Sequence, residues 1–218
     1  MKQEEIDDHL EQACAEGDLN QVKYWLTSTK LKKHANIHCN YESPLRFASM
    51  HGHLEIVKYL LTSSELKNHA YIIAGNTYAF RIACANGHLD IVKYLLTSPD
   101  LSLKANIHTK DEDGLGSACS KGQLEVIKYL LTSSDLLFKA NIHANGDNAF
   151  KMCSAHKQYH VLEYFIFDLN IKQTNEIKKF INQHPDDKIT KMFEKRLIFQ
   201  ELEKDLSSDK IYKKKVKL

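Results

Sequence analysis

Histidine and cysteine, which often bind metals or act in catalysis, are frequent in this chain: 12 histidines and five cysteines occur among 218 residues. His38, His108 and His143 differ by multiples of 35 positions, so they share one position of a repeating unit. Stacked helices lie about 8 to 10 Å apart, whereas zinc needs ligand nitrogens about 2.0 to 2.1 Å away. Histidines at one position of successive repeats are therefore too far apart to bind one ion, and we expect no metal or other cofactor. We call such a series of residues at one repeat position a ladder. Hydrogen bonding within and between repeats is the expected role of these histidines.

The cysteines follow the same interval, because Cys14, Cys84 and Cys119 also share one repeat position. Their expected separation exceeds the roughly 7 Å between Cα atoms that a disulfide tolerates. An odd number of unpaired cysteines indicates a reducing compartment, so the predicted location is the cytoplasm. His38 and Cys39 could pair a base with a nucleophile, but neighbours in an extended segment point to opposite faces. With no phosphate-binding loop or nucleophile elbow, we expect no enzyme.

Five tyrosines form a third ladder, and a lysine precedes most of them. Stacked aromatic rings beside lysines could hold nucleic-acid bases. A half-buried row that supports helix packing is the interpretation we prefer, because the row recurs with the repeat itself. The members of this ladder are Tyr24, Tyr59, Tyr94, Tyr129 and Tyr164.

All three ladders come from one string that returns every 35 residues. It begins at Gly17, Gly52, Gly87 and Gly122, for example GHLEIVKYLLTS, and a weaker match begins at Lys157. Self-similarity at a fixed period is typical of a solenoid, in which each unit buries its apolar face against its neighbours. The period therefore predicts a stacked array, and it favours binding over catalysis.

Each unit is predicted to be a helix, a tight turn and a second helix. Residues 43–51 fit a short first helix, and Gly52 fits its left-handed C-terminal cap. Residues 54–61 are apolar over the wide face expected of a second helix. A polar loop then leads to an Ala-Asn-Ile-His segment, for which we expect a short extended element.

These residues resemble the ankyrin repeat. Ser43-Pro44-Leu45-Arg46-Phe47-Ala48 matches the T-P-L-H-x-A signature at three positions, and residues 52–58 match the G-H-L-E-[IV]-V-K core throughout. The resemblance covers about residues 3–168. It implies an all-α fold, an ankyrin-repeat solenoid of about five helix-turn-helix repeats with short hairpin fingers and a C-terminal helical extension.

The predicted organisation has three parts. Thr174 or Asn175 should cap a helix over residues 176–183, and a break at His184-Pro185 should precede a longer helix over about residues 186–206. An apolar stripe on that helix, Ile189, Met192, Phe193, Leu197 and Leu202, should dock on the fifth repeat. The expected boundaries are an array at 3–168 (repeats 3–34, 35–69, 70–104, 105–139 and 140–168), capping helices at 169–208 and a basic tail at 209–218.

Two departures from the family pattern affect stability. The Thr and His that join standard repeats are replaced by Tyr78/Arg81, Asp113/Gly116 and Asn148/Lys151, so their hydrogen-bond network is not expected. The fourth repeat has two glycines at the start of its first helix, and glycine inside a helix costs about 1 kcal/mol relative to alanine. That repeat is the predicted weak point of the array.

Binding residues should lie where the repeats differ, and the finger segments share almost nothing. The family binds partners through fingers and first helices, so the resemblance places a partner site on the concave face. Aromatic and arginine side chains are the usual anchors, and three successive acidic residues favour a basic segment on the partner. The predicted contact residues are Tyr41, Glu42, Arg46, Met50, Tyr78, Arg81, Asp111, Glu112 and Asp113.

Two functions remain open. The first is a monomeric, non-enzymatic scaffold for a partner protein; the repeat style resembles ankyrin proteins of intracellular bacteria, which suggests an effector delivered into a host cell to act on a host protein. The alternative is a nuclear or nucleic-acid-associated factor that uses the basic tail, Lys213, Lys214, Lys215 and Lys217. Residues 1–170 carry 17 basic against 20 acidic residues and residues 171–218 carry 13 against 8, so the array itself does not favour nucleic acid. The apolar runs are too short to cross a bilayer.

Overall fold

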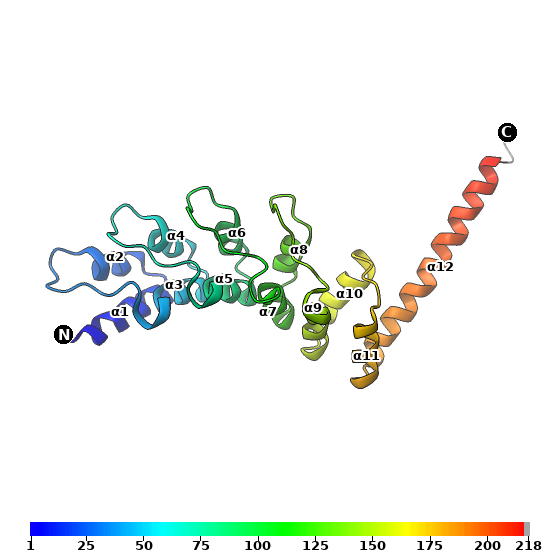
Figure 1. Cartoon of the computed structure of the whole chain (residues 1–218), viewed down its shortest axis with the longest axis horizontal. Coiled ribbons are helices and arrows are strands. Elements are labelled where there is room, and N and C mark those ends of the chain that lie inside the picture. Colours follow the sequence, from blue (N-terminus) through cyan, green and yellow to red (C-terminus); the bar gives the residue numbers. More distant parts are fainter. Residues whose placement is uncertain (216–218) are drawn as a thin grey trace.

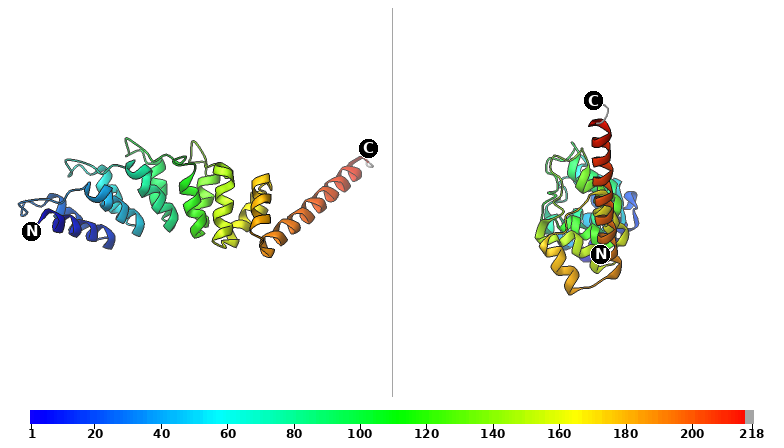
Figure 2. Two further views of the ribbon diagram at one scale, coloured as in Figure 1. Left: turned by 60° about the horizontal axis from the view of Figure 1, so that its bottom comes forward. Right: turned by 90° about the vertical axis from the view of Figure 1, so that its right-hand side faces the viewer.

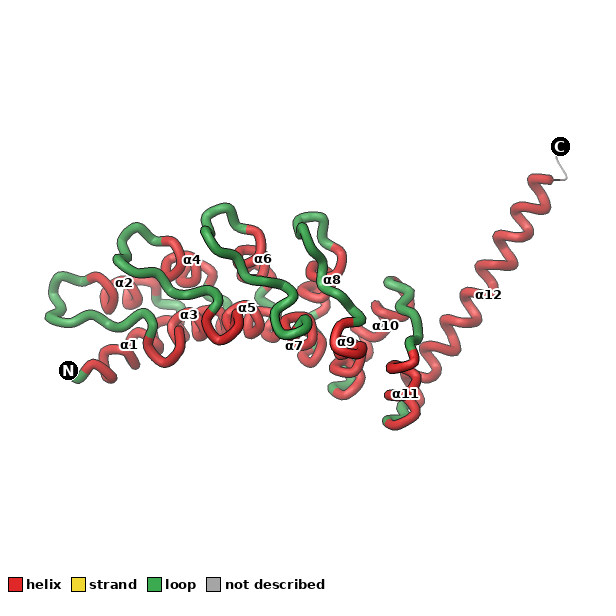
Figure 3. Tube along the Cα trace, in the orientation of Figure 1, coloured by secondary structure: helices red, strands yellow, loops and turns green. Residues whose placement is uncertain are grey.

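The computed structural model shows a single row of helix pairs (Figures 1 and 3). It describes the backbone of residues 1–215 and the side chains of residues 1–75 and 77–204. Over these residues the chain is all-helical, as predicted, and has no strand. The five pairs are α1 (Gln3–Glu16) with α2 (Leu19–Thr27), α3 (Cys39–His51) with α4 (Leu54–Thr62), α5 (Ala74–Asn86) with α6 (Leu89–Thr97), α7 (Asp113–Lys121) with α8 (Leu124–Thr132), and α9 (Ala144–Ala155) with α10 (Tyr159–Glu163).

The turn inside each pair depends on its glycine. Gly52 ends α3 in the left-handed conformation, with φ 83°, and its backbone N–H is hydrogen-bonded to the carbonyl of Ala48. A Cβ atom at this position would also lie 2.6 Å from the ring of His88 in the next repeat. Glycine is therefore needed for the backbone conformation and for the approach of the neighbouring repeat, and the predicted cap is confirmed.

The repeats stack on a continuous apolar core that both helices of each pair supply. In the second repeat, Leu45 and Ala48 of the first helix and Ile56, Val57 and Leu60 of the second are all buried. Burial of apolar surface between repeats, which no pair could achieve alone, is the main stabilising term of the array.

The Ala-Asn-Ile-His segment forms turns where an extended element was expected. The Ala35 N–H donates to the carbonyl of Trp25 at 2.9 Å, which ties the segment to the end of α2. The side chain of Asn36 accepts from the His38 N–H at 3.0 Å, and Ile37 is buried. The side-chain bond holds the chain in a turn, so the segment is not available for a β-ladder.

A single left-handed turn then precedes the right-handed part of each first helix after α1. Asn40, Tyr41 and Glu42 have φ values of 45°, 58° and 63°, so the right-handed helix begins at Ser43, as the sequence predicts. Non-glycine residues adopt this conformation at a cost of about 1 kcal/mol each, so local bonds must hold it. The same turn recurs at Lys110, Asp111 and Glu112 and at Asn145, Gly146 and Asp147.

The array ends in a different way from its internal repeats. The helix α10 continues into a π-helix, η1 (Tyr164–Asp168), and α11 (Asn175–Gln183) and α12 (Asp187–Lys215) follow. Thr174 caps α11, since its hydroxyl accepts from the Ile177 N–H at 3.1 Å. The ring of Phe193 on α12 lies 6.0 Å from that of Phe150, so the base of α12 packs on the fifth repeat.

The docking prediction for α12 holds for only part of the helix. Ile189, Met192 and Phe193 are buried, but Leu197 and Leu202 are 59% and 51% exposed. The helix reaches Lys215, beyond the expected end near residue 206, and its C-terminal part projects away from the array (Figure 2). At 3.6 residues per turn Leu202 falls on the opposite side of the helix from the first three positions. Leu197 continues their side, but it is exposed where the helix projects away from the array (Figure 2). Among the described residues, no helix combines the length and apolar composition needed to cross a membrane.

Candidate protein-binding face

A row of side-chain pairs joins neighbouring first helices. Glu11 accepts a hydrogen bond from Ser43, and Arg81 forms an ion pair with Asp113, each across 32 positions. The guanidinium of Arg46 lies 4.9 Å from the ring centre of Tyr78, which is also 32 positions further along. We call this set of pairs the first-helix row. It occupies the positions where the family's Thr and His were found to be replaced.

Two arginines enclose the ring of Tyr78. The guanidinium carbons of Arg46 and Arg81 lie 4.9 and 5.0 Å from its centre, a geometry that favours cation–π attraction. Arg46 donates to the carbonyl of Asn40 at 3.0 Å, and Arg81 binds Asp113. The Nε atoms of both arginines are buried without a hydrogen-bond partner. Three of the predicted contact residues, Arg46, Tyr78 and Arg81, are thus brought together, with Tyr41 on the turn that precedes α3 proper.

Glu42 and Glu112 are inside the protein, where the prediction placed them on the surface. Their exposed fractions are 4% and 6%. The Glu42 carboxylate is hydrogen-bonded to Nδ1 of His38 at 2.6 Å. It also accepts a 3.1 Å hydrogen bond from the backbone N–H of Tyr71 in the next repeat. The left-handed turn directs the carboxylate inward, and sequence spacing gave no sign of that turn.

The acidic run therefore presents less charge than expected. Glu112 is hydrogen-bonded to His108 at 2.5 Å, and Asp113 is paired with Arg81. Asp111 is exposed, so it is the carboxylate of this run that faces solvent. Tyr41 is 88% exposed.

The histidine after the turn glycine links each repeat to the one before it. His53 donates from Nε2 to the carbonyl of Ala15 at 2.9 Å, and His88 donates to that of Met50 at 2.8 Å. Glutamine replaces histidine in later repeats, and its amide reaches the same carbonyl position at 3.2 Å. These side chains therefore have a structural role, because each joins two successive repeats.

The lysine and tyrosine ladders form a second row, on the second helices. The ammonium groups of Lys23, Lys93 and Lys128 lie 5.1, 5.4 and 5.8 Å from the ring centres of the tyrosines one repeat further on. We call this set the second-helix row. Tyr59 and Tyr129 are buried, so their rings support packing and offer no platform for bases.

The cysteines are buried thiols. All five are free. Burial raises the pKa of the Cys39 thiol to about 12 and raises the pKa of Cys84 further still. Thiolate is the nucleophilic form, so the geometry gives Cys39 no reactive character beside His38. Among the described residues no group of three or more His, Cys, Asp or Glu could hold a metal ion.

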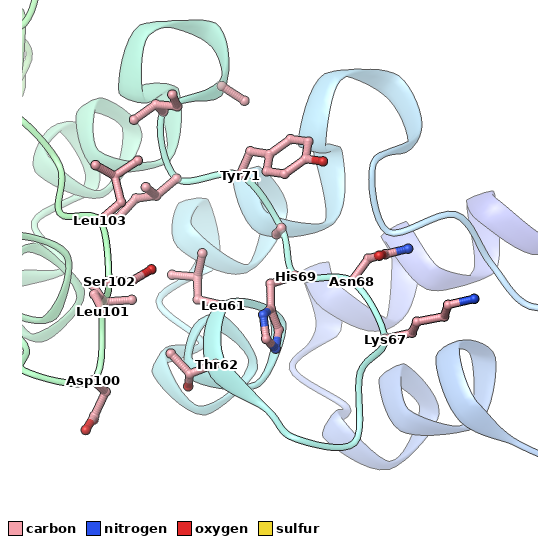
Figure 4. A pocket seen from close by; sticks show the side chains of 14 residues that line it. Leu61, Thr62, Lys67, Asn68, His69, Tyr71, Asp100, Leu101, Ser102 and Leu103 are labelled. Atoms are coloured by element: carbon pink, nitrogen blue, oxygen red, sulfur yellow. The ribbon is translucent and has the colours of Figure 1, made fainter.

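A groove between two loops was missed by the sequence reasoning. Figure 4 shows it between the loops that follow α4 and α6, with a volume of about 950 Å³. Tyr71, Ile73 and Leu103 line it and are 61%, 56% and 52% exposed. Ile73 occupies the position that holds histidine in the neighbouring repeats, and this change of residue type was the available signal.

The tail predicted to carry a targeting signal lies outside this description. The side chains of Lys213, Lys214 and Lys215 and the whole of Lys217 are beyond the described residues.

Comparison with protein families gives one match. The model for "Ankyrin repeats (3 copies)" matches residues 10–111 and again residues 80–176. A search of curated proteins found no match. The two matched segments cover most of the chain and coincide with the stacked helix pairs, and repeats of this kind serve protein–protein interaction. The chain belongs to the ankyrin-repeat family.

Proposed function

We propose that this chain is a non-enzymatic scaffold that binds a partner protein through the turns and first helices of its second to fourth repeats. The observation that carries the proposal is the exposed Tyr41 beside the Arg46–Tyr78–Arg81 cluster. Aromatic and arginine side chains dominate binding energy at protein interfaces. The contact residues proposed are Tyr41, Arg46, Met50, Tyr78, Arg81 and Asp111.

The charge of this face supports a more specific expectation than the sequence allowed. Arg81 has a carboxylate partner, whereas the bonds of Arg46 are to a backbone carbonyl and an aromatic ring. A carboxylate of the partner could form a charge-assisted hydrogen bond with the Arg46 guanidinium. We therefore expect at least one acidic contact on the partner, whereas the acidic run alone suggested a basic segment.

The test uses a partner identified by affinity capture and mass spectrometry. The double variant Tyr41→Ala with Arg46→Ala should weaken binding of that partner at least about tenfold, because each side chain is a typical anchor. The matched control is Tyr24→Ala, a tyrosine that is 37% exposed on a second helix. Equal affinity of the double variant and the native chain would contradict the proposed face, provided that both melt at the same temperature.

The cellular setting is a further part of the proposal. The style of the repeats supports a bacterial effector that works in the cytoplasm of a host cell and binds a host protein. Capture should then recover the partner from a host-cell lysate. Specific capture from bacterial lysate alone would argue against the effector role and leave the binding face intact.

A further inference from the structure

The helix α12 carries a group of apolar side chains that the array covers only in part: the ring of Phe199 packs edge-on against that of Phe167, with the ring centres 6.5 Å apart. Its buried residues, Ile189, Met192 and Phe193, pack toward the fifth repeat. On a different side, Ile198, Phe199 and Leu202 are 58%, 43% and 51% exposed. Figures 1 and 2 show this part of the helix projecting away from the array. Large apolar side chains grouped on one exposed surface mark an interaction site.

Three lysines extend the same face toward the base of the helix. Lys188, Lys191 and Lys195 are exposed, and their spacing of three and four residues continues through Ile198 to Leu202. Side chains at such intervals lie on one side of an α-helix. We call these five residues, together with Phe199, the α12 stripe. Acidic residues border the stripe: Asp187 lies four positions before Lys191, Glu194 four before Ile198 and Glu203 four after Phe199.

Two of the three lysines, Lys188 and Lys195, lie close to aromatic rings. The Lys188 ammonium lies 4.0 Å from the ring centre of Tyr159. That of Lys195 lies 5.8 Å from the ring centre of Phe167 and 5.7 Å from that of Phe199. Their positive charges remain at the surface, so an anionic partner can reach them.

Charge separates the C-terminal segment that contains α12 from the rest of the molecule. Residues 1–170 carry three more acidic than basic residues, by 20 against 17, while residues 171–218 carry five more basic than acidic ones, by 13 against 8. An anionic surface would thus attract the C-terminal segment in preference to the array. A second copy is a poorer occupant, because parallel pairing would set Lys191 and Lys195 against the same lysines.

From these observations we propose that the α12 stripe binds an anionic lipid surface. Ile198, Phe199 and Leu202 enter the boundary between headgroups and acyl chains, and the lysines contact the anionic headgroups. A helix with one apolar side and lysines beside it lies in such an interface without spanning it. Each lysine near the surface adds about 1 kcal/mol, so binding is reversible and depends on salt. The membrane would then hold the array by its end and leave the first-helix row accessible.

The experiment is co-sedimentation of the full chain with vesicles. Phosphatidylcholine vesicles containing about 30 mol% phosphatidylserine should bind the chain, pure phosphatidylcholine should not, and raising the salt concentration should release it. Equal binding to both vesicle types, or to neither, would overturn the proposal.

Variants test which residues are responsible. Ile198→Asp with Leu202→Asp should lower binding to the anionic vesicles at least about tenfold, and so should Lys191→Glu with Lys195→Glu. The matched controls leave the stripe intact. Leu197→Asp changes an apolar residue that is 59% exposed on another face, and Lys67→Glu with Lys139→Glu reverses two exposed lysines of the loops. Both should bind as the native chain does, and an equal loss in the controls would overturn the assignment.

Light scattering distinguishes the competing occupant. The free chain should have the mass of one copy, 25.1 kDa, at micromolar concentration. A species of twice that mass that Ile198→Asp with Leu202→Asp converts to one copy would show that a second chain covers the stripe. That result would overturn the lipid proposal. Circular dichroism of every variant checks that the helix content is preserved.

Discussion

Both rows join neighbouring repeats, but they differ in how constant their residue types are from one junction to the next. The second-helix row uses a lysine over a tyrosine at three junctions, with distances from 5.1 to 5.8 Å. The first-helix row keeps the same 32-residue spacing at each junction but changes its chemistry, from Glu11 with Ser43 to Arg46 with Tyr78 and Arg81 with Asp113. A constant row indicates a constraint from packing. A row whose residue types vary at a constant spacing can carry side chains that recognise a partner.

The largest effect should come from removing the core beneath both rows. Phe80 is 1% exposed, and its ring packs directly against Gly114. A Cβ atom on Gly114 would lie only 2.5 Å from that ring. Phe80→Ala should lower the free energy of unfolding by about 3 to 5 kcal/mol. Urea denaturation measures the loss. A cost below 1 kcal/mol would show that the junction between α5 and α7 is loosely packed.

The converse substitution tests what the glycines of the fourth repeat do. Helix propensity alone predicts that Gly114→Ala stabilises the chain by about 1 kcal/mol. The structure predicts a loss of about 1 to 3 kcal/mol, because the new methyl group would collide with Phe80. The sign of the change in the urea midpoint decides between them.

A medium effect is expected at the histidine links. His88→Ala should cost about 1 to 2 kcal/mol, since it removes the bond to the Met50 carbonyl and uncovers Gly52. His88→Gln is the matched control, because Gln123 makes the equivalent bond in the next repeat. Thermal melting compares the two variants. A glutamine as damaging as alanine would mean that the imidazole ring itself is required.

The first-helix row should contribute less to stability than to recognition. A double-mutant cycle of Arg81→Ala and Asp113→Ala should give a coupling of about 1 kcal/mol or less, because Asp113 is 35% exposed and water screens the pair. Urea titrations of the four chains measure it. A coupling above 3 kcal/mol would make this row part of the scaffold and weaken its contrast with the second-helix row.

The smallest effect belongs to the second-helix row taken one contact at a time. Lys93→Ala should cost about 0.5 kcal/mol, the size of an exposed cation–π contact. Lys58→Ala is a useful comparison, because Lys58 bonds to Glu55 at 2.7 Å. Thermal melting of both variants shows whether the tyrosine contact adds anything to an ordinary surface lysine.

Much of the architecture could be predicted because period and burial have direct physical signatures. The glycine caps, the start of the right-handed helix at Ser43 and the Thr174 cap follow from local chemistry that the sequence displays. The inward carboxylate of Glu42 could not be predicted, because it depends on three successive residues in a left-handed turn, a conformation without a sequence rule. The approach of Phe80 to Gly114 is likewise a long-range contact that local helix propensity does not reveal.

The site was predicted less completely than the fold. Residue variability pointed to Tyr41, Arg46, Tyr78 and Arg81, and the last three do cluster. Some residues differ between repeats because they bind a partner protein. Others, such as Glu112, point inward and bond to a residue of the same chain, here His108. Variability between repeats does not distinguish the two kinds. That distinction needs the three-dimensional neighbours.

The 32-residue span of the first-helix pairs also constrains how such an array can evolve. Each pair takes one member from each of two successive repeats, so duplicating the third repeat would oppose Arg81 with a second copy of Tyr78 where Asp113 now stands. Nearly identical second helices make the repeats look interchangeable. The side-chain pairs between repeats nevertheless fix the order of the repeats. If the repeats were rearranged, each new junction would bring together side chains that do not form a matching pair.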